Sequence, residues 1–249
     1  MKAHLRRWME SMACRGASEA VARRLTAFAA AYLRRHSPED GLRMLMDLDA
    51  RLYALQGPAA VAWGGGLHPK HRLMRYHDFF VARVRSGQTV LDIGCGLGAL
   101  ARDVAERTGA RVTGIDLSPE NIRQARERFA HSNIEYIQGD ALTDLPGRHF
   151  DVVIMSNVLE HIERRVEFIQ QVNRRIQPRR WLIRVPVFER DWRVPLKREL
   201  GLEWRLDDTH FTEYTQESFQ EEMEQARMRN LHLEIRWSEI WSELCPLTD

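Results

Sequence analysis

Cysteine, lysine and long apolar segments are scarce in this chain. The three cysteines, Cys14, Cys95 and Cys245, lie far apart and show neither CxxC nor zinc-ligand spacing, so neither a disulfide framework nor a cysteine zinc site is expected. No apolar run approaches the roughly 18–20 residues that span a bilayer, and the N-terminal residues lack the apolar segment of a secretion signal. We therefore expect a cytoplasmic protein without a transmembrane segment.

Net charge is also small. The chain has 37 basic and 35 acidic residues, a net charge of +2. This small net charge does not indicate nucleic acid or a membrane as a binding partner. Lysine occurs only at Lys2, Lys70 and Lys197, and arginine supplies the remaining positive charge. With 249 residues and 44% hydrophobic content, the chain can bury the core of one large domain, or of a smaller domain with an extension.

The hydrophobic pattern changes near residue 85. Residues 1–84 have helical periodicity and are expected to form an N-terminal helical extension or cap, with a loop at Gly57-Pro58 and Gly64–Gly66. Residues 85–249 alternate short apolar strands with helices, which is typical of parallel βαβ units in a second domain. Helices are expected around 5–12, 20–32 and 38–56, strands at 89–93, 111–115, 134–138, 151–155 and 181–185, and one or two antiparallel closing strands within 231–244.

A glycine-rich turn follows the first expected strand, in the run VLDIGCGLG at residues 90–98. Glycine is needed where the backbone takes positive φ or passes close to a ligand, and the next helix presents free N–H groups at its N-terminus. Gly94, Gly96 and Ala99 also satisfy the relaxed dinucleotide fingerprint, so a NAD-dependent oxidoreductase is an alternative. Asp92 argues against it, because dinucleotide binders usually continue the apolar strand at that position.

The run VLDIGCGLG resembles the first motif of the class I S-adenosylmethionine (SAM)-dependent methyltransferases, and further motifs follow in that family's order. GIDLS resembles its acidic ribose-binding turn, GDA its adenine-binding turn, and NVLEHI the loop after its fourth strand. The resemblance covers residues 85–187 and implies SAM as cofactor and a Rossmann-like α/β fold, with a seven-stranded, mostly parallel sheet flanked by helices. The cofactor-binding residues that it implies are Asp92, Gly94, Gly96, Gly98, Asp116, Leu117, Asp140, Ala141 and Asn157.

Methyl transfer to a hydroxyl needs a group that accepts the hydroxyl proton, and histidine is the usual base at neutral pH. His161 follows the fourth expected strand, and His210 precedes a helix expected around 218–226. The resemblance implies that both segments approach the methyl end of the cofactor. We predict Glu160, His161 and His210 as the catalytic residues.

A metal site is an alternative use of the same residues. Some relatives, including ubiquinone-pathway O-methyltransferases and small-RNA 2′-O-methyltransferases, bind a divalent metal through Glu-x-x-Glu-His and a downstream histidine. Here Asn157 stands in place of the first glutamate, so one negative charge is lost, while Glu160, His161 and His210 are retained. In the other interpretation, Glu160 and His161 cap a helix and shape the pocket wall. The sequence favours this second interpretation, and no metal is predicted.

Two further segments are candidates for ligand contact. The basic residues of 68–77 either meet the SAM carboxylate or an anionic acceptor, or form a solvated helix with Phe79 and Phe80 packed inward. Residues 186–197 are long and aromatic for a connection, and long loops are often functional. We expect them to form part of an acceptor pocket, with a plain surface loop as the alternative.

The N-terminal extension is basic, with eight basic residues against two acidic ones in residues 1–37. Such an excess is most often a solvated helix face, and we expect the extension to cap the catalytic domain or to make a homodimer contact. The leading hypothesis is a methyltransferase acting at oxygen on a small or medium-sized metabolite, with no nucleic acid as partner. The alternatives are a nucleic-acid or protein methyltransferase that docks through these helices, and a non-catalytic SAM-binding protein.

Overall fold

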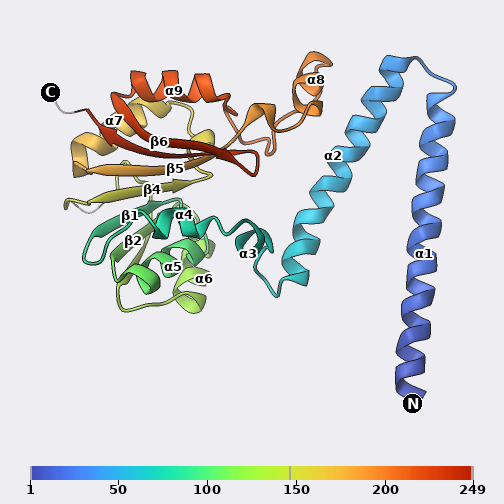
Figure 1. Cartoon of the computed structure of the whole chain (residues 1–249), viewed down its shortest axis with the longest axis horizontal. Coiled ribbons are helices and arrows are strands. Elements are labelled where there is room, and N and C mark those ends of the chain that lie inside the picture. Colours follow the sequence, from blue (N-terminus) through green and yellow to red (C-terminus); the bar gives the residue numbers. More distant parts are fainter. Residues whose placement is uncertain (1, 146, 248–249) are drawn as a thin grey trace.

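In the computed structural model, an α/β body is preceded by two long helices (Figure 1). The structure describes residues 2–145 and 147–247, with side chains from residue 16 onward, so the apolar face predicted for residues 5–12 lies outside the described side chains. The helices are α1 (Lys2–Leu33), α2 (Pro38–Trp63), α3 (Lys70–Met74), α4 (His77–Val81), α5 (Ala99–Thr108), α6 (Pro119–Arg128), α7 (Arg165–Ile176), α8 (Arg193–Glu199) and α9 (Gln216–Gln225), with the short turns η1 (Leu159–His161) and η2 (Phe188–Arg190).

A seven-stranded sheet forms the centre of the body, in the order β3-β2-β1-β4-β5-β7-β6. The first five strands along the chain are parallel, and β7 runs antiparallel to both β5 and β6. This confirms the predicted Rossmann-like α/β fold and its antiparallel closing strands. The strands are β1 (Thr89–Ile93), β2 (Arg111–Asp116), β3 (Ile134–Gln138), β4 (Val152–Ser156), β5 (Arg180–Pro186), β6 (Met228–Arg236) and β7 (Glu239–Pro246).

Helices cover both faces of this sheet, with α4, α5 and α6 on one side and α7 and α9 on the other (Figure 1). The two cores contain side chains from these helices, for example Phe80 and Leu100 on the first face and Phe168 and Phe219 on the second. Because both faces are covered, β4 and β5 consist almost entirely of buried residues.

The central strand β1 determines where the turns of the body gather. Ile93, its last residue, pairs with Ile115 of β2 on one side and with Met155 of β4 on the other. These parallel strands therefore end at one edge of the sheet. The strand order reverses between β1 and β4, and open α/β sheets bind ligands in the crevice at such a reversal.

The N-terminal region differs from the expected pair of short helices before residue 37. Residues 2–33 form one continuous helix, because Gly16, the residue between the two predicted helices, costs only about 1 kcal/mol relative to alanine. α2 likewise continues through Gly57-Pro58, where a loop was expected. Proline removes one helical hydrogen bond there, and the alanine-rich sequence that follows favours resumption of the helix.

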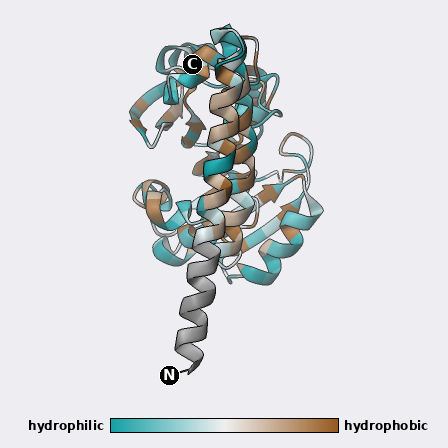
Figure 2. Ribbon diagram, turned by 90° about the vertical axis from the view of Figure 1, so that its right-hand side faces the viewer, coloured by the Kyte–Doolittle hydropathy of each residue, from teal (hydrophilic) through white to brown (hydrophobic). Residues whose placement is uncertain are grey.

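α1 lies beyond α2 and away from the α/β body (Figure 1). Figure 2 shows hydrophobic and hydrophilic residues mixed along the described part of these helices, and Phe28 is 72% exposed. α2 borders the body through an ion pair between Asp49 and Arg193 of α8. Among the described residues, no helix is long and apolar enough to cross a membrane.

The packed body begins earlier than the boundary expected at residues 84 and 85. Tyr76, Phe79 and Phe80 are buried and share a core with α5. The inward packing of Phe79 and Phe80 is therefore confirmed, but the helix that carries them belongs to the body. Their apolar contacts with α5 place α3 and α4 beside the carboxyl edge of the sheet.

Candidate functional site

The turn after β1 needs glycine for two physical reasons. Gly94, Gly96 and Gly98 have φ angles of 67°, 53° and 84°, in the region that residues with a Cβ rarely adopt. A Cβ on Gly94 would lie 2.4 Å from a methyl carbon of Val158, and one on Gly98 would lie 2.4 Å from the Tyr136 hydroxyl. The turn is thus held close to the loop after β4, and the N-terminus of α5 faces the crevice with free N–H groups.

Asp116, at the end of β2, binds this turn directly. Its Oδ2 accepts a hydrogen bond of 2.8 Å from Gly96 N, and its Oδ1 accepts from Ser118 N at 2.9 Å and from the Asn121 side chain at 3.1 Å. The neighbouring Leu117 is 69% exposed. The structure therefore brings the first two predicted motifs together, with an apolar side chain presented beside the carboxylate.

The third predicted turn lies next along the same edge. Gly139 N donates to Asp116 O at 3.0 Å, which fixes the turn after β3 against the end of β2. Asp140 is exposed, and its Oδ1 accepts from Leu142 N at 2.7 Å, while Ala141 is buried. Asp140 thus keeps most of its carboxylate open to the crevice.

Asp92 lies beneath the glycine turn and is 2% exposed. Its Oδ2 has no hydrogen-bond partner among the described residues. Burial, together with the charge of Asp116, raises the pKa of Asp92 to about 8. A buried carboxyl without a partner is costly, and a cationic group placed beside it would favour its charged form.

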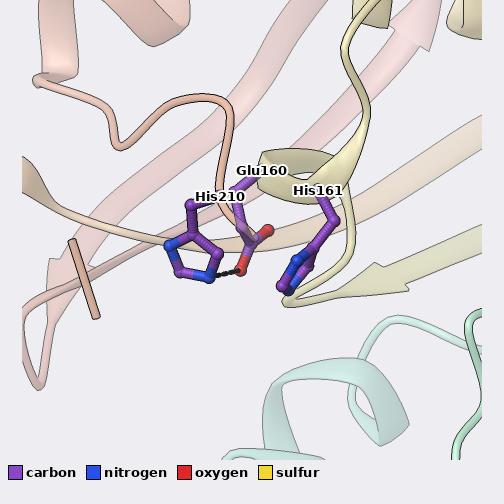
Figure 3. A group of neighbouring side chains, drawn as sticks. All are labelled: Glu160, His161 and His210. Atoms are coloured by element: carbon purple, nitrogen blue, oxygen red, sulfur yellow. Dashed lines mark ion pairs between the residues drawn. The ribbon is translucent and has the colours of Figure 1, made fainter. Parts of the chain in front are cut away.

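Three predicted catalytic side chains converge at the end of β4. Ligand atoms of Glu160, His161 and His210 all lie within 4.8 Å of one another. Figure 3 shows the two imidazoles on either side of the Glu160 carboxylate, with the His210 Nε2 4.0 Å from Glu160 Oε1. The sequence separates His210 from the other two by a strand and two helices, and the fold brings it back to them.

Each histidine of this cluster is oriented through its Nδ1. His210 Nδ1 lies 2.9 Å from Glu213 Oε1, and Glu213 also pairs with Arg190 of η2. His161 Nδ1 lies 2.8 Å from the Thr209 hydroxyl. These contacts leave the Nε2 atoms of both rings free to face the Glu160 carboxylate.

The protonation of the cluster follows from its burial. Glu160 is 1% exposed, and neither of its carboxylate oxygens has a hydrogen-bond partner among the described residues. Burial raises the pKa of Glu160 to about 7. Burial, with the nearby His210, lowers the pKa of His161, so this imidazole is neutral at pH 7 and can accept a proton.

Asn157 lies near this cluster without joining it. Its φ of 57° is left-handed, and its backbone N–H donates to Arg184 O at 2.8 Å. The Asn157 side chain lies between Arg184 and Glu239, on the neighbouring strands β5 and β7. The structure therefore directs it toward these two charged side chains.

The sequence interpretation missed the charged side chains of β5 and β7. Arg184 is 2% exposed, its guanidinium lies 3.8 Å from the centre of the Tyr76 ring, and its Nε is 3.6 Å from Glu239 Oε2. One Arg184 nitrogen, and the Glu239 Oε2 of this ion pair, have no hydrogen-bond partner among the described residues. An arginine inside the otherwise apolar run WLIRVP was the available signal.

The basic segment before β1 folds over this side of the site. His71 Nδ1 lies 3.0 Å from His77 Nε2, and His77 Nδ1 lies 2.7 Å from Asp103 Oδ2 on α5. Burial lowers the pKa of His71 to about 4, with a further contribution from His77. His71 is therefore neutral, and a pocket of about 430 Å³ opens beside it, between α3 and α5.

Comparisons with known proteins agree on one kind of domain. Residues 90–179 match the family model described as "Methyltransferase domain". A ribosomal protein L11 methyltransferase of Thermotoga maritima is 34% identical over 116 residues, covering 46% of this chain and 42% of the relative. A mitochondrial ubiquinone biosynthesis O-methyltransferase of Schizosaccharomyces pombe is 34% identical over 127 residues, covering 47% and 46%. The matched part thus spans less than half the length of these relatives.

Solved structures show the same fold at lower identity. The small RNA methyltransferase HEN1 superposes with a TM-score of 0.57 at 19% identity, over 71% of this chain and 25% of that one. The magnesium protoporphyrin IX methyltransferase of Synechocystis PCC 6803, solved with bound SAH, has a TM-score of 0.55 at 20% identity, over 70% and 83%.

Substitution of Asp92 by asparagine should stabilise the protein more at alkaline than at acidic pH. Because the pKa of Asp92 is raised to about 8, the folded chain keeps a proton that the unfolded chain releases near pH 4 (about 3.9 for a free aspartate). Wild-type stability should therefore lose this contribution progressively between about pH 4 and pH 8, whereas the asparagine variant has no such proton to lose.

Urea unfolding between about pH 5 and pH 9 measures the difference, with the exposed Asp140→Asn as the matched control. A stability difference between Asp92→Asn and wild type that stays constant with pH would contradict this account.

Proposed function

We propose that this chain, which carries a class I SAM-dependent methyltransferase domain, transfers the SAM methyl group to a hydroxyl oxygen of a small or medium-sized metabolite. One observation carries the proposal: the Glu160–His161–His210 cluster stands at the end of β4, whose loop packs on the glycine turn through Val158. Proton-accepting groups are thereby placed next to the cofactor crevice. The relatives' names include both a protein and an oxygen as acceptor, so the proton-accepting groups of the site are what favours a hydroxyl acceptor.

The residues along the carboxyl edge fit SAM. Asp116 and Asp140 have carboxylate oxygens at the ends of neighbouring strands, suited to ribose hydroxyls and to an adenine amino group, and Leu117 offers an exposed apolar surface between them. The turn Gly94–Gly98 leaves room for the ligand to approach the backbone. Asp92, whose Oδ2 has no hydrogen-bond partner among the described residues, would offer a carboxyl group to a positively charged part of SAM bound at this turn.

The chain's own residues would act on the acceptor by holding it and removing its proton. His161, neutral and oriented by Thr209, can take the hydroxyl proton on Nε2. Alignment of two reactants can supply up to roughly 7–11 kcal/mol of barrier lowering, and a general base about 10²–10⁴-fold in rate. Positioning by the pocket is therefore the larger contribution, and the base adds to it.

A divalent cation fits the same cluster. Glu160 does not cap a helix in the structure, because η1 and α7 have no side-chain cap and both carboxylate oxygens of Glu160 are unpartnered. The Nδ1 contacts of His210 with Glu213 and of His161 with Thr209 resemble the outer contacts that orient metal-bound histidines. Glu160, His161 and His210 would hold the cation, which would favour the deprotonated form of an acceptor hydroxyl.

Replacement of His161 or His210 by alanine should lower turnover by about 10²–10⁴-fold, because each removes a proton-accepting or ligating nitrogen from the cluster. Affinity for S-adenosylhomocysteine (SAH) should stay unchanged, since neither side chain belongs to the glycine turn or to the Asp116 turn. Turnover is measured as SAH release with an acceptor found by screening. The control is His149→Ala, whose half-exposed side chain lies beside Asp151. Loss of SAH binding in the His161 or His210 variant would show that these residues are misplaced.

Replacement of Glu160 by glutamine should abolish binding of Mn²⁺ measured by calorimetry in the absence of acceptor. The substitution removes the one negative charge of the cluster while keeping its shape. Glu163→Gln, an exposed glutamate in the same loop, should bind Mn²⁺ as the wild type does. Equal Mn²⁺ affinity in Glu160→Gln and wild type, or no binding in either, would leave the cluster as a metal-free base.

A further inference from the structure

Helix α2 and the segment after it are attached to the body at two places, and the first of these leads toward the catalytic cluster. Near its middle, Asp49 pairs with Arg193 of α8 at 3.0 Å. α8 follows η2, where Arg190 pairs with Glu213, the residue that orients His210. After α2 ends, Gly66 O accepts a hydrogen bond of 3.3 Å from Arg128 of α6, and the chain continues to α3.

The second attachment leads to α3 (Lys70–Met74). Lys70, the first residue of α3, has a pKa lowered mainly by burial, and the Glu160 and Glu239 carboxylates oppose that shift. Figure 1 shows α2 running from beside α8 to beside α3, along the end of the body where these loops gather.

The stretch of α2 between these attachments is apolar and exposed. No Asp, Glu, Lys or Arg occurs in residues 52–69. Leu52 and Tyr53 are 43% and 58% exposed, and they follow Asp49 by three and four residues. Residues at these spacings share one face of a helix, so the ion pair of Asp49 with α8 turns Leu52 and Tyr53 toward the body. An apolar face of this kind is normally covered by a ligand or partner.

Exposed apolar side chains also lie on the body next to the cluster. Phe211 is 58% exposed, and its backbone N–H donates to Glu160 O at 2.8 Å. Trp192, directly before α8, is 69% exposed. Apolar side chains are thus exposed on α2 and on the segments that contain Trp192 and Phe211.

We propose that the α2 face containing Leu52 and Tyr53 forms a wall of the acceptor site, and that the acceptor is an amphipathic molecule with an apolar body and a hydroxyl. The inference rests on the proposed function. The hydroxyl reaches Glu160 and His161, while the apolar body lies between α2 and Phe211. The ion pair of this face with α8, which follows the Arg190–Glu213–His210 contacts, favours the acceptor over a second copy of the chain as the occupant. The absence of charge on residues 52–69 disfavours a polyanion such as RNA.

A series of 4-alkylphenols with increasing chain length tests the proposal, because each offers one hydroxyl and an adjustable apolar body. Binding is measured by calorimetry on the full chain saturated with SAH. Affinity should rise by about fourfold for each added methylene that the wall buries. Leu52→Glu should reduce the increase to less than about twofold, since a carboxylate then faces the apolar body.

The matched control is Ala54→Glu, which introduces the same charge at an exposed position of α2 that does not share the face of Leu52 and Tyr53. It should keep the wild-type dependence on chain length. An affinity independent of chain length, or equal loss in both variants, would overturn the proposal. The proposal would also be overturned if sedimentation showed a wild-type dimer that only Leu52→Glu dissociates. It would likewise be overturned if the chain bound a single-stranded RNA more tightly than the longest phenol. Failure of wild type to bind SAH would count against the proposed function instead.

Discussion

The hydrogen bond from Gly96 N to the Asp116 carboxylate joins the ends of the two strands on which the rest of the site depends. It holds the glycine turn in its left-handed conformation over β1, and the same residue binds Gly139 N through its backbone carbonyl. The turns after β1, β2 and β3 are therefore fixed relative to one another before any ligand binds. Val158, packed on Gly94, extends this arrangement to the loop after β4 and so to Glu160.

Beyond the sheet, a series of contacts between charged side chains positions His210 beside Glu160. Arg190 pairs with Glu213, Glu213 binds His210, and His210 faces Glu160. Because Glu213 and His210 are both buried, these contacts are screened from solvent and orient the imidazole more firmly than surface pairs would. The outer ion pair Asp49–Arg193 is half exposed, so it adds little to the free energy of unfolding. Its role is to position α2 beside α8.

The sequence predicted the parallel body well, because its signals are local. Buried strands read as short apolar runs, and the strands after residue 85 begin and end within a few residues of their predicted limits. It could not predict that His210 meets Glu160, since that contact depends on how η2, α8 and the segment after them return to the sheet. The resemblance, rather than the spacing, placed His210 at the site.

Other differences have equally physical causes. Two separate helices were expected before residue 37 and a loop at Gly57-Pro58, yet α1 continues through Gly16 and α2 through Pro58. The favourable helical residues around them outweigh one lost hydrogen bond or about 1 kcal/mol of entropy. Arg184 was overlooked because a charged residue inside an apolar strand is recognised as significant only when Glu239 and Tyr76 are seen around it.

The most direct test of the central claim is a calorimetric titration of the purified chain with SAH, beside an Asp116→Ala variant and with NAD as the competing ligand. The account predicts that wild type binds SAH and not NAD. The variant, shown by its unfolding curve to be folded, should lose about 10–100-fold in affinity, the value of hydrogen bonds from a charged carboxylate. Binding of NAD without SAH, or SAH affinity that the variant keeps, would contradict the account and return the glycine turn to the dinucleotide-binding alternative.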